Sequence, residues 1–283
     1  HPMVRVIAHR GARSLAPENT LTAAKKAWRL GADLWETDVQ LTCDGALVLF
    51  HDKTLLRCTD AAAKFPDRAC DDLAAFSLTE LNRLDAGSYF VRTDPFGQIA
   101  EGQLSAADLA ECEKAVIPTL EQALAFTQNA GWKVNLELKS FRKADQTTEL
   151  PRKTLDVICQ SGILPDKVVI SSFHHSFLRY ISQAAPQIEV QALVDRAEHA
   201  FFTGRNLEFA TYNVHADLVN DSLVGQLKSM GRKINVFTVN DRQHFFCLEK
   251  MGVDGIFTDF VQWFCPGHVH DGSKKICNRR IEK

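Results

Sequence analysis

Two pairs of charged residues occupy alternate positions within short β-rich runs. Glu36 and Asp38 are separated by one residue, and Glu137 and Lys139 repeat that spacing. Because successive side chains of a strand point to opposite faces, both members of each pair lie on one face. Two neighbouring carboxylates are costly to bury unless a positive group lies between them. A metal ion meets that need for the first pair, with an Arg or Lys partner as the alternative. For the second pair the alternative is an in-strand ion pair or a solvated face.

Histidines end two further β-rich runs. His9 is followed by Arg10, and His51 is followed by Asp52. Imidazoles are the usual general acids and bases near neutral pH, and a guanidinium binds phosphate oxygens well. Taken alone, each histidine is equally well explained as an ordinary polar residue at the end of a strand. Together, the four strand ends supply three carboxylates, two imidazoles and two cations, a combination that indicates one shared site.

The elements that must position these residues are β-rich runs alternating with amphipathic helices, a pattern typical of a parallel sheet covered by helices. Nine strands are predicted. They are residues 4–9, 33–41, 47–51, 133–138, 167–172, 189–194, 209–213, 233–239 and 255–258.

One of these nine strands is not expected to belong to the parallel set. The strands at 33–41 and 47–51 are joined by a very short link, and Asp44-Gly45 within it is typical of a hairpin. A hairpin is antiparallel, so the second strand should fold back on the first and bring His51 close to the paired carboxylates. The other eight strands predict a TIM (β/α)8 barrel, whose catalytic groups lie at the C-terminal strand ends.

Strand and helix alternation is interrupted after the hairpin and resumes with a helix predicted at 119–131. We interpret residues 53–116, which include a helical run at 77–84, as a small subdomain inserted at the catalytic rim of one barrel domain covering residues 1–283. Loops at this rim usually determine specificity. The insertion is therefore expected to select the substrate, while the barrel performs the chemistry. A C-terminal tail with several basic residues, 266–283, is expected to be solvated.

Length and charge exclude several classes of partner. A chain of 283 residues suits one barrel of about 250 residues. The formal net charge of −2 argues against nucleic acid, which needs a basic face. No apolar run approaches the roughly 18 residues of a membrane span, so stable membrane insertion is not expected. The sequence specifies no oligomeric state.

Eight cysteines form no CxxC pair, and a core of this size needs no disulfide staples. We therefore expect mostly structural, reduced thiols and a cytoplasmic location. The alternative is a periplasmic or secreted protein whose leader has been removed. In that case bridges are expected among Cys58, Cys70 and Cys112, or between Cys265 and Cys277.

An ordered series of motifs, which extends over roughly residues 4 to 260, resembles the glycerophosphodiester phosphodiesterase family. Any single motif is weak evidence, whereas the ordered set is specific. The motifs are HRG at 9–11, APENT at 16–20, GAD at 31–33, ETDV at 36–39, DG at 44–45, FHD at 50–52, LDAGSYF at 84–90, IPTL at 117–120, NLELK at 135–139, SSF at 171–173 and GVDGIFTD at 252–259.

This resemblance implies a metal-assisted site. Glu36, Asp38 and Glu137 would hold one divalent cation, and three carboxylates suit Mg²⁺ or Ca²⁺ better than Zn²⁺. Arg10 and Lys139 would bind the substrate phosphate.

The resemblance also implies the remaining roles. His9 and His51 would divide general acid and general base catalysis, without an assignment of which is which. Phe173 and Phe237 would line the substrate pocket, although Phe237 stands where the family usually has Trp. The histidines without a matching motif, such as His215, are expected to be structural or exposed.

The activity implied is metal-dependent hydrolysis of small glycerophosphodiesters, such as glycerophosphocholine or glycerophosphoethanolamine, to glycerol 3-phosphate and an alcohol. One alternative is phospholipase D-like hydrolysis of lysophospholipids or sphingolipids, with Phe90, Phe96, Phe201 and Phe202 as candidate lipid contacts. The other is a non-catalytic barrel that senses phosphodiesters. The complete set of histidines, acids and lysine argues against that reading.

Overall fold

Short strands alternate with helices in the computed structural model, which describes residues 3–141, 148–198, 200–203 and 207–265. The tail predicted at 266–283 lies outside the described residues. The strands are β1 (Arg5–Ala8), β2 (Leu34–Leu41), β3 (Leu47–Leu49), β4 (Val134–Leu138), β5 (Val168–Ser172), β6 (Glu189–Val194), β7 (Thr211–His215), β8 (Lys233–Phe237) and β9 (Gly255–Thr258).

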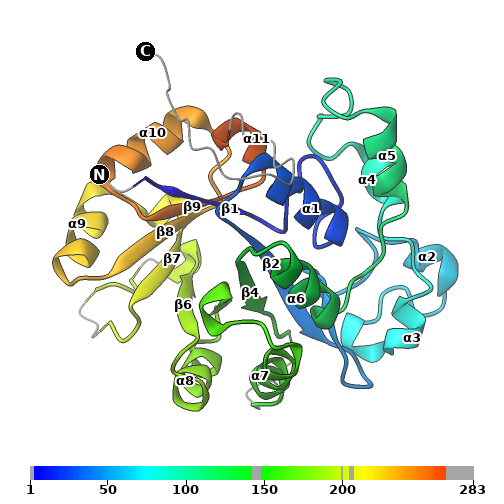
Figure 1. Cartoon of the computed structure of the whole chain (residues 1–283), viewed down its shortest axis with the longest axis horizontal. Coiled ribbons are helices and arrows are strands. Elements are labelled where there is room, and N and C mark those ends of the chain that lie inside the picture. The colour runs from blue at the N-terminus through cyan, green and yellow to red at the C-terminus, as the bar shows by residue number, and fades with distance from the viewer. Residues whose placement is uncertain (1–2, 142–147, 199, 204–206, 266–283) are drawn as a thin grey trace.

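Eight of these strands are parallel and close into a barrel wrapped by helices (Figure 1). β1 pairs with both β2 and β9, which closes the ring in the order β1-β2-β4-β5-β6-β7-β8-β9. The predicted TIM (β/α)8 barrel is confirmed. The surrounding helices are α1 (Leu21–Leu30), α6 (Leu120–Asn129), α7 (Glu149–Ser161), α8 (His175–Ala184), α9 (Asp221–Ser229), α10 (Arg242–Met251) and α11 (Val261–Phe264).

The ninth strand, β3, pairs antiparallel with the end of β2, as the hairpin prediction required. Val39 pairs with Leu49, and the Phe50 amide donates to the Asp38 carbonyl (3.0 Å), which extends the pairing towards His51. Gly45 in the turn has a φ of 82°, a left-handed conformation that glycine adopts without strain. The hairpin therefore carries His51 back beside the acids of β2.

Side chains on the barrel strands alternate between the helix layer and the barrel interior. On β4, Val134, Leu136 and Leu138 belong to the main hydrophobic core, whereas Asn135 and Glu137 occupy the intervening positions. Because a strand repeats every two residues, these polar side chains point inward. The barrel interior towards the C-terminal ends of the strands is consequently polar, and the candidate residues lie there.

Residues 53–116 build a second hydrophobic core beside the barrel. Its helices are α2 (Ala61–Lys64), α3 (Leu78–Leu81), α4 (Ser88–Thr93) and α5 (Ala106–Glu113). This core also includes Ala23 of α1, Val48 of β3 and Phe50, so the barrel supplies part of it. In Figure 1 the insertion lies next to α1, along the side of the barrel that carries the hairpin.

Several predicted boundaries were wrong. The strands predicted at 47–51 and 233–239 end at Leu49 and Phe237, and the helix predicted at 119–131 ends at Asn129. The helix predicted at 77–84 ends at Leu81, because Leu84 and Ala86 turn into the second core and the Ala86 amide bonds the Ala115 carbonyl. The strand predicted at 209–213 is β7, shifted by two residues. The Phe209 amide donates to the Tyr212 hydroxyl (3.1 Å) instead of to a neighbouring strand.

Within the described residues, Cys43, Cys58, Cys70, Cys112, Cys159 and Cys247 form no disulfide bond with one another. Cys265 is buried at the end of the described chain, and Cys277, its predicted partner in an exported protein, lies outside the described residues. Within the described part of the chain, no helix combines the length and apolar character that crossing a membrane requires.

Candidate active site

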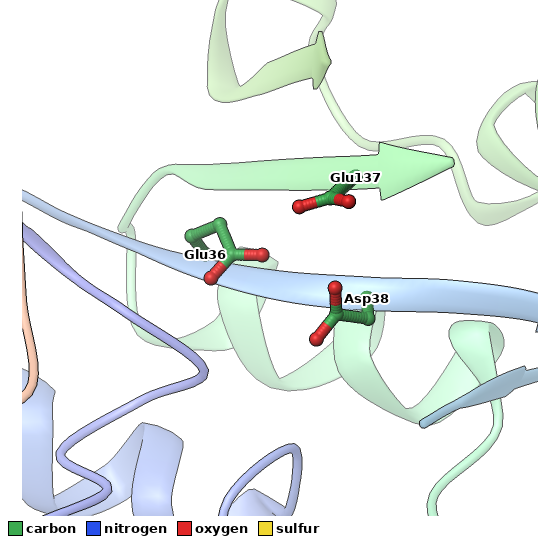
Figure 2. A group of neighbouring side chains, drawn as sticks. All are labelled: Glu36, Asp38 and Glu137. Atoms are coloured by element: carbon green, nitrogen blue, oxygen red, sulfur yellow. The ribbon is translucent and has the colours of Figure 1, made fainter. Parts of the chain in front are cut away.

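The predicted site residues meet at the C-terminal rim of the barrel. Glu36 and Asp38 lie on β2 and Glu137 lies on β4, paired in register opposite Asp38. Figure 2 shows the three carboxylates facing a common space between these two strands. His9 and Arg10 directly follow β1. His51 lies just after the end of β3 in the hairpin, and Lys139 is the first residue after β4.

The three acids offer converging oxygens. One carboxylate oxygen from each of Glu36, Asp38 and Glu137 lies within 4.8 Å of the others. The second oxygen of Glu36 accepts a hydrogen bond from the Arg10 amide (2.8 Å), and that of Asp38 accepts one from Asn19 Nδ2 (2.8 Å). Among the described residues, no hydrogen-bond donor reaches Glu36 Oε1 or Asp38 Oδ1. Glu36 and Asp38 are thus each held by one oxygen and present the other.

Two cations border the acids. Lys139 Nζ lies 2.7 Å from Glu137 Oε1 and 3.5 Å from Asp38 Oδ1. Arg10 Nε lies 3.3 Å from Asp38 Oδ2, and Arg10 Nη1 donates to Glu18 Oε1 (2.9 Å). A guanidinium has five N–H donors, so Arg10 retains donors for a substrate oxygen.

These charges do not balance. Burial, reinforced by Asp38 and Glu137, raises the pKa of Glu36 well above its ordinary value. Burial also raises the pKa of Glu137, against the opposing charge of Lys139. Burial alone would raise the pKa of Asp38 too, but Lys139 and Arg10 hold it below its usual range. The two organic cations therefore leave excess negative charge in the cluster.

Both histidines have a carboxylate on the same ring nitrogen. His9 Nδ1 lies 2.7 Å from Asp259 Oδ1, and His51 Nδ1 lies 2.7 Å from Asp52 Oδ1. A carboxylate at Nδ1 keeps the proton of the neutral ring there and leaves Nε2 as the atom that exchanges protons. Burial and the charge of Arg10 lower the pKa of His9 below its ordinary value, against the effect of Asp259.

The loop between β1 and α1 requires unusual backbone conformations. Arg10 and Asn19 have positive φ values of 54° and 56°. Gly11 has a φ of 81°, and a Cβ at this position would lie 2.6 Å from the Ala23 Cβ, so only glycine fits. With this backbone, Asn19 Oδ1 accepts the Asp38 amide (3.0 Å) while its Nδ2 holds the Asp38 carboxylate.

Four supporting residues were not identified as part of the site from the sequence. Glu18 and Asn19 belong to the APENT motif, and Asp259 ends the GVDGIFTD motif, but their partners depend on the closed barrel. Arg57 lies in the insertion, where it hydrogen-bonds both Glu18 and Asp52. The sequence feature that could have indicated such partners is an acidic residue within an apolar stretch, because a buried carboxylate requires a charged or hydrogen-bonding partner.

An aromatic corner, formed by Phe173, Phe237 and His215, borders the acids. The Phe173 and Phe237 rings lie 6.0 Å apart at 85°, and His215 lies 5.5 Å from Phe237. Lys139 Nζ is 6.0 Å from the Phe173 ring centroid, and Phe173 is 40% exposed. His215, which was expected to be structural or exposed, therefore belongs to the rim.

The phenylalanines proposed as lipid contacts are mostly elsewhere. Phe90 and Phe202 are buried in the two hydrophobic cores. Phe201 is half-buried against His175. Phe96 is half-buried edge-on to Phe260. These positions do not form an exposed apolar surface that would favour a lipid substrate.

The donor set fits one hard divalent cation. Three carboxylates supply oxygen ligands, the ligands that Mg²⁺ and Ca²⁺ prefer. Two of those oxygens lack hydrogen-bond donors among the described residues, and burial beside the other two acids disfavours the ionised form of Glu36 when no cation is bound. With flanking cations and two carboxylate-oriented imidazoles, the rim has the groups that hydrolysis of a phosphate ester requires.

Comparison with known proteins agrees with this chemistry. The sequence model of the Glycerophosphoryl diester phosphodiesterase family matches residues 9–263. A glycerophosphodiester phosphodiesterase from Caldanaerobacter subterraneus subsp. tengcongensis is 33% identical over 261 residues, which cover 90% of this chain and 93% of that protein. One from Bacillus altitudinis is 31% identical over 262 residues, which cover 91% and 95%.

A solved structure shares both the fold and part of the sequence. It is an Oleispira antarctica phosphodiesterase in complex with the product sn-glycerol-3-phosphate, with a TM-score of 0.72 and 29% identity, covering 92% of this chain and 94% of that chain. Barrel and rim thus define a phosphodiester hydrolase. The chain belongs to the glycerophosphoryl diester phosphodiesterase family, and its activity is the hydrolysis of glycerophosphodiesters.

Proposed function

We propose that the enzyme cleaves glycerophosphodiesters to sn-glycerol 3-phosphate and an alcohol, with one Mg²⁺ or Ca²⁺ ion held by Glu36, Asp38 and Glu137. The convergence of three carboxylate oxygens within 4.8 Å carries the proposal. The solved relative in complex with sn-glycerol-3-phosphate supports the choice of product.

The phosphate is bound by the cations around the acids. When bound, the ion neutralises charge that develops on the phosphoryl oxygens. Lys139, 3.5 Å from Asp38 Oδ1, and Arg10, 3.3 Å from Asp38 Oδ2, add positive charge on either side of that carboxylate. Glu18 and Asp38 orient the Arg10 guanidinium, so it meets the phosphate without rearranging.

His9 and His51 transfer the protons. Each ring is oriented through Nδ1 by a carboxylate, so Nε2 accepts or delivers a proton at an oxygen of the substrate or of water. The lowered pKa of His9 favours its neutral, proton-accepting form. His51 is close enough for its charge to influence the pKa of both Asp38 and Glu137.

The alcohol lies against Phe173 and Phe237, and the Phe173 ring also contacts Lys139. A polar groove continues from Lys139 towards the insertion, where Lys53 and Asp72 line it. This groove supports the proposal that the insertion contributes to the choice of head group.

Metal removal and product analysis test these proposals together. The chelated protein is assayed with glycerophosphocholine and glycerophosphoethanolamine after separate addition of Mg²⁺, Ca²⁺, Mn²⁺ or Zn²⁺. We expect turnover with Mg²⁺ or Ca²⁺ and glycerol 3-phosphate as the phosphorylated product. Full turnover after chelation would contradict the metal site, and release of glycerol with a phosphorylated alcohol would contradict the product assignment.

A further inference from the structure

Arg57 connects the insertion to the proton-transfer machinery. Its guanidinium donates to both oxygens of Asp52, from Nε (2.6 Å) and from Nη2 (2.9 Å). The same group donates to both oxygens of Glu18, from Nη1 (2.9 Å) and Nη2 (2.7 Å). One side chain thus bridges the carboxylate behind His51 to a buried carboxylate of the β1–α1 loop.

Both ends of this bridge are fixed. Glu18 is buried, and Arg10 and Arg13 also bind it (2.9 and 2.7 Å). Although burial alone would raise the pKa of Glu18, its hydrogen bonds to Arg57 and the charges of Arg13 and Arg10 hold it well below the ordinary range, so it stays ionised. The Arg57 backbone is anchored because Leu55 and Cys58, on either side, are buried in the second core.

The two histidines differ in this support. Asp259, behind His9, receives a hydrogen bond from Asn240 (2.7 Å) and only a long one from Arg13 (3.5 Å). For Asp52, the hydrogen bonds to the carboxylate come from His51 and from Arg57. The carboxylate that orients the His51 ring therefore depends on the insertion, whereas the carboxylate that orients His9 is supported from the barrel.

We propose that Arg57 and Glu18 form a clamp that positions the Asp52–His51 pair, which makes Arg57 a positioning residue for proton transfer by His51. This inference rests on the proton-transfer role proposed for His51. It assigns part of the chemistry to the insertion, beyond the choice of head group.

Arg57→Ala tests the clamp, because the side chain is 46% exposed and its loss should leave the protein folded. We expect kcat for glycerophosphocholine to fall at least about tenfold, less than in His51→Ala, with KM changed less than about twofold. Millimolar guanidinium should restore part of the lost kcat of Arg57→Ala, since it can occupy the space between the two carboxylates. Arg57→Lys should remain impaired, because an ammonium cannot bind two carboxylates in bidentate fashion.

Arg179→Ala is the matched control. Arg179 is also exposed and bidentate on a carboxylate, Glu208 (2.6–3.1 Å), but it lies on α8. The Arg179→Ala variant should retain wild-type kcat, and added guanidinium should not change that kcat.

A double substitution separates the two proposals. Arg57→Ala should cost nothing further in a His51→Ala background. An equal loss in both backgrounds, or no rescue by guanidinium, would overturn the clamp. If His51→Ala itself retains activity, the proton-transfer role fails and the clamp falls with it. If His51→Ala loses activity but Arg57→Ala keeps wild-type kcat, the clamp is contradicted and the role of His51 stands.

Discussion

Three buried carboxylates of like charge determine how the protein without metal responds to pH. Because the folded-state pKa of Glu36 lies above its ordinary value, ionising it disfavours the native state. Its contribution is therefore fully favourable below the ordinary carboxyl range and is lost as the pH rises through the raised pKa. A bound cation reverses this loss, so binding should strengthen with pH.

Glu36→Gln should remove both the loss of stability at high pH and the strengthening of cation binding with pH. We expect the metal-free variant to match or exceed wild type in Tm at pH 8, to lose the Mg²⁺-dependent rise in Tm, and to lose metal-dependent turnover. Asp38→Asn should also abolish turnover and leave the barrel folded. Thermal unfolding at pH 5.5 and pH 8, with and without Mg²⁺, checks this. A variant that keeps the Mg²⁺-dependent rise would show that Glu36 is not a ligand.

The histidines make a separate kinetic prediction. His9→Ala and His51→Ala should each lower kcat by at least about 10²-fold, the scale usual for lost acid–base catalysis. Their combined effect should be much less than multiplicative if both serve one proton-transfer sequence. Steady-state kinetics of the single and double variants measures this, and two small, independent effects would indicate substrate binding instead.

Phe173 is expected to affect binding more than chemistry. Its ring contacts Phe237 and Lys139, which bind substrate in the proposed function, and it holds no group that transfers a proton. Phe173→Ala should raise KM for glycerophosphocholine severalfold, with kcat changed less than about twofold, because it removes contact present in both ground and transition states. Leu164→Ala, which truncates an exposed side chain away from the rim, provides the control. A large fall in kcat with constant KM would contradict a pocket role.

At the scale of elements, the insertion and the barrel are less separable than the sequence indicated. If the insertion served only to select the alcohol, deletion of residues 53–116, with a short linker in their place, would leave a folded barrel that binds metal and still cleaves a small activated phosphodiester slowly. That deletion would uncover Ala23, Val48 and Phe50, which belong to the shared core, and would remove Arg57 from Asp52. Single substitutions in the groove test head-group selection more cleanly.

Asp72→Asn is such a substitution, because Asp72 lines the groove that starts at Lys139 and pairs with Lys53 (3.4 Å). We expect the ratio of kcat/KM for glycerophosphocholine and glycerophosphoethanolamine to change by roughly two- to fivefold, the scale of an exposed charge. The neighbouring Asp71, paired with Arg68, does not line the groove, and Asp71→Asn should leave the ratio unchanged. An unchanged ratio in both variants would mean that this groove does not select the alcohol.

The hairpin shows what local sequence can specify. Asp44-Gly45 and the alternation of β2 predicted the antiparallel β3, and with it the approach of His51 to the acids. The carboxylates of Glu36 and Asp38 were likewise identified because spacing along a strand is a local property. The partners of Glu18 were not, because two arginines of its own loop and Arg57 of the insertion converge on it only after the chain has folded.

For the whole molecule, the site depends on ring closure between β1 and β9. The amides of Arg5 in β1 and of Ser14 in the loop after it donate to the carbonyls of Asp254 and Asp259, which flank β9. The first and last elements of the barrel therefore hold each other. The insertion shares core residues with the barrel. We therefore expect activity, tryptophan fluorescence and far-UV circular dichroism to be lost in one urea transition at saturating Mg²⁺. Loss of activity at clearly lower urea would reveal a rim that unfolds before the barrel.

The hydrogen bond between His9 and Asp259 spans 250 positions of the chain. A ribosome adds about 5–20 residues per second, so roughly 12–50 s separate the synthesis of these two partners. In about the second half of that interval, after Glu137 has been added, the nascent chain contains all three proposed metal ligands, yet His9 has no carboxylate behind it. All three proposed cation ligands are therefore synthesised before the partner of His9, and catalytic competence arrives only with the closing strand.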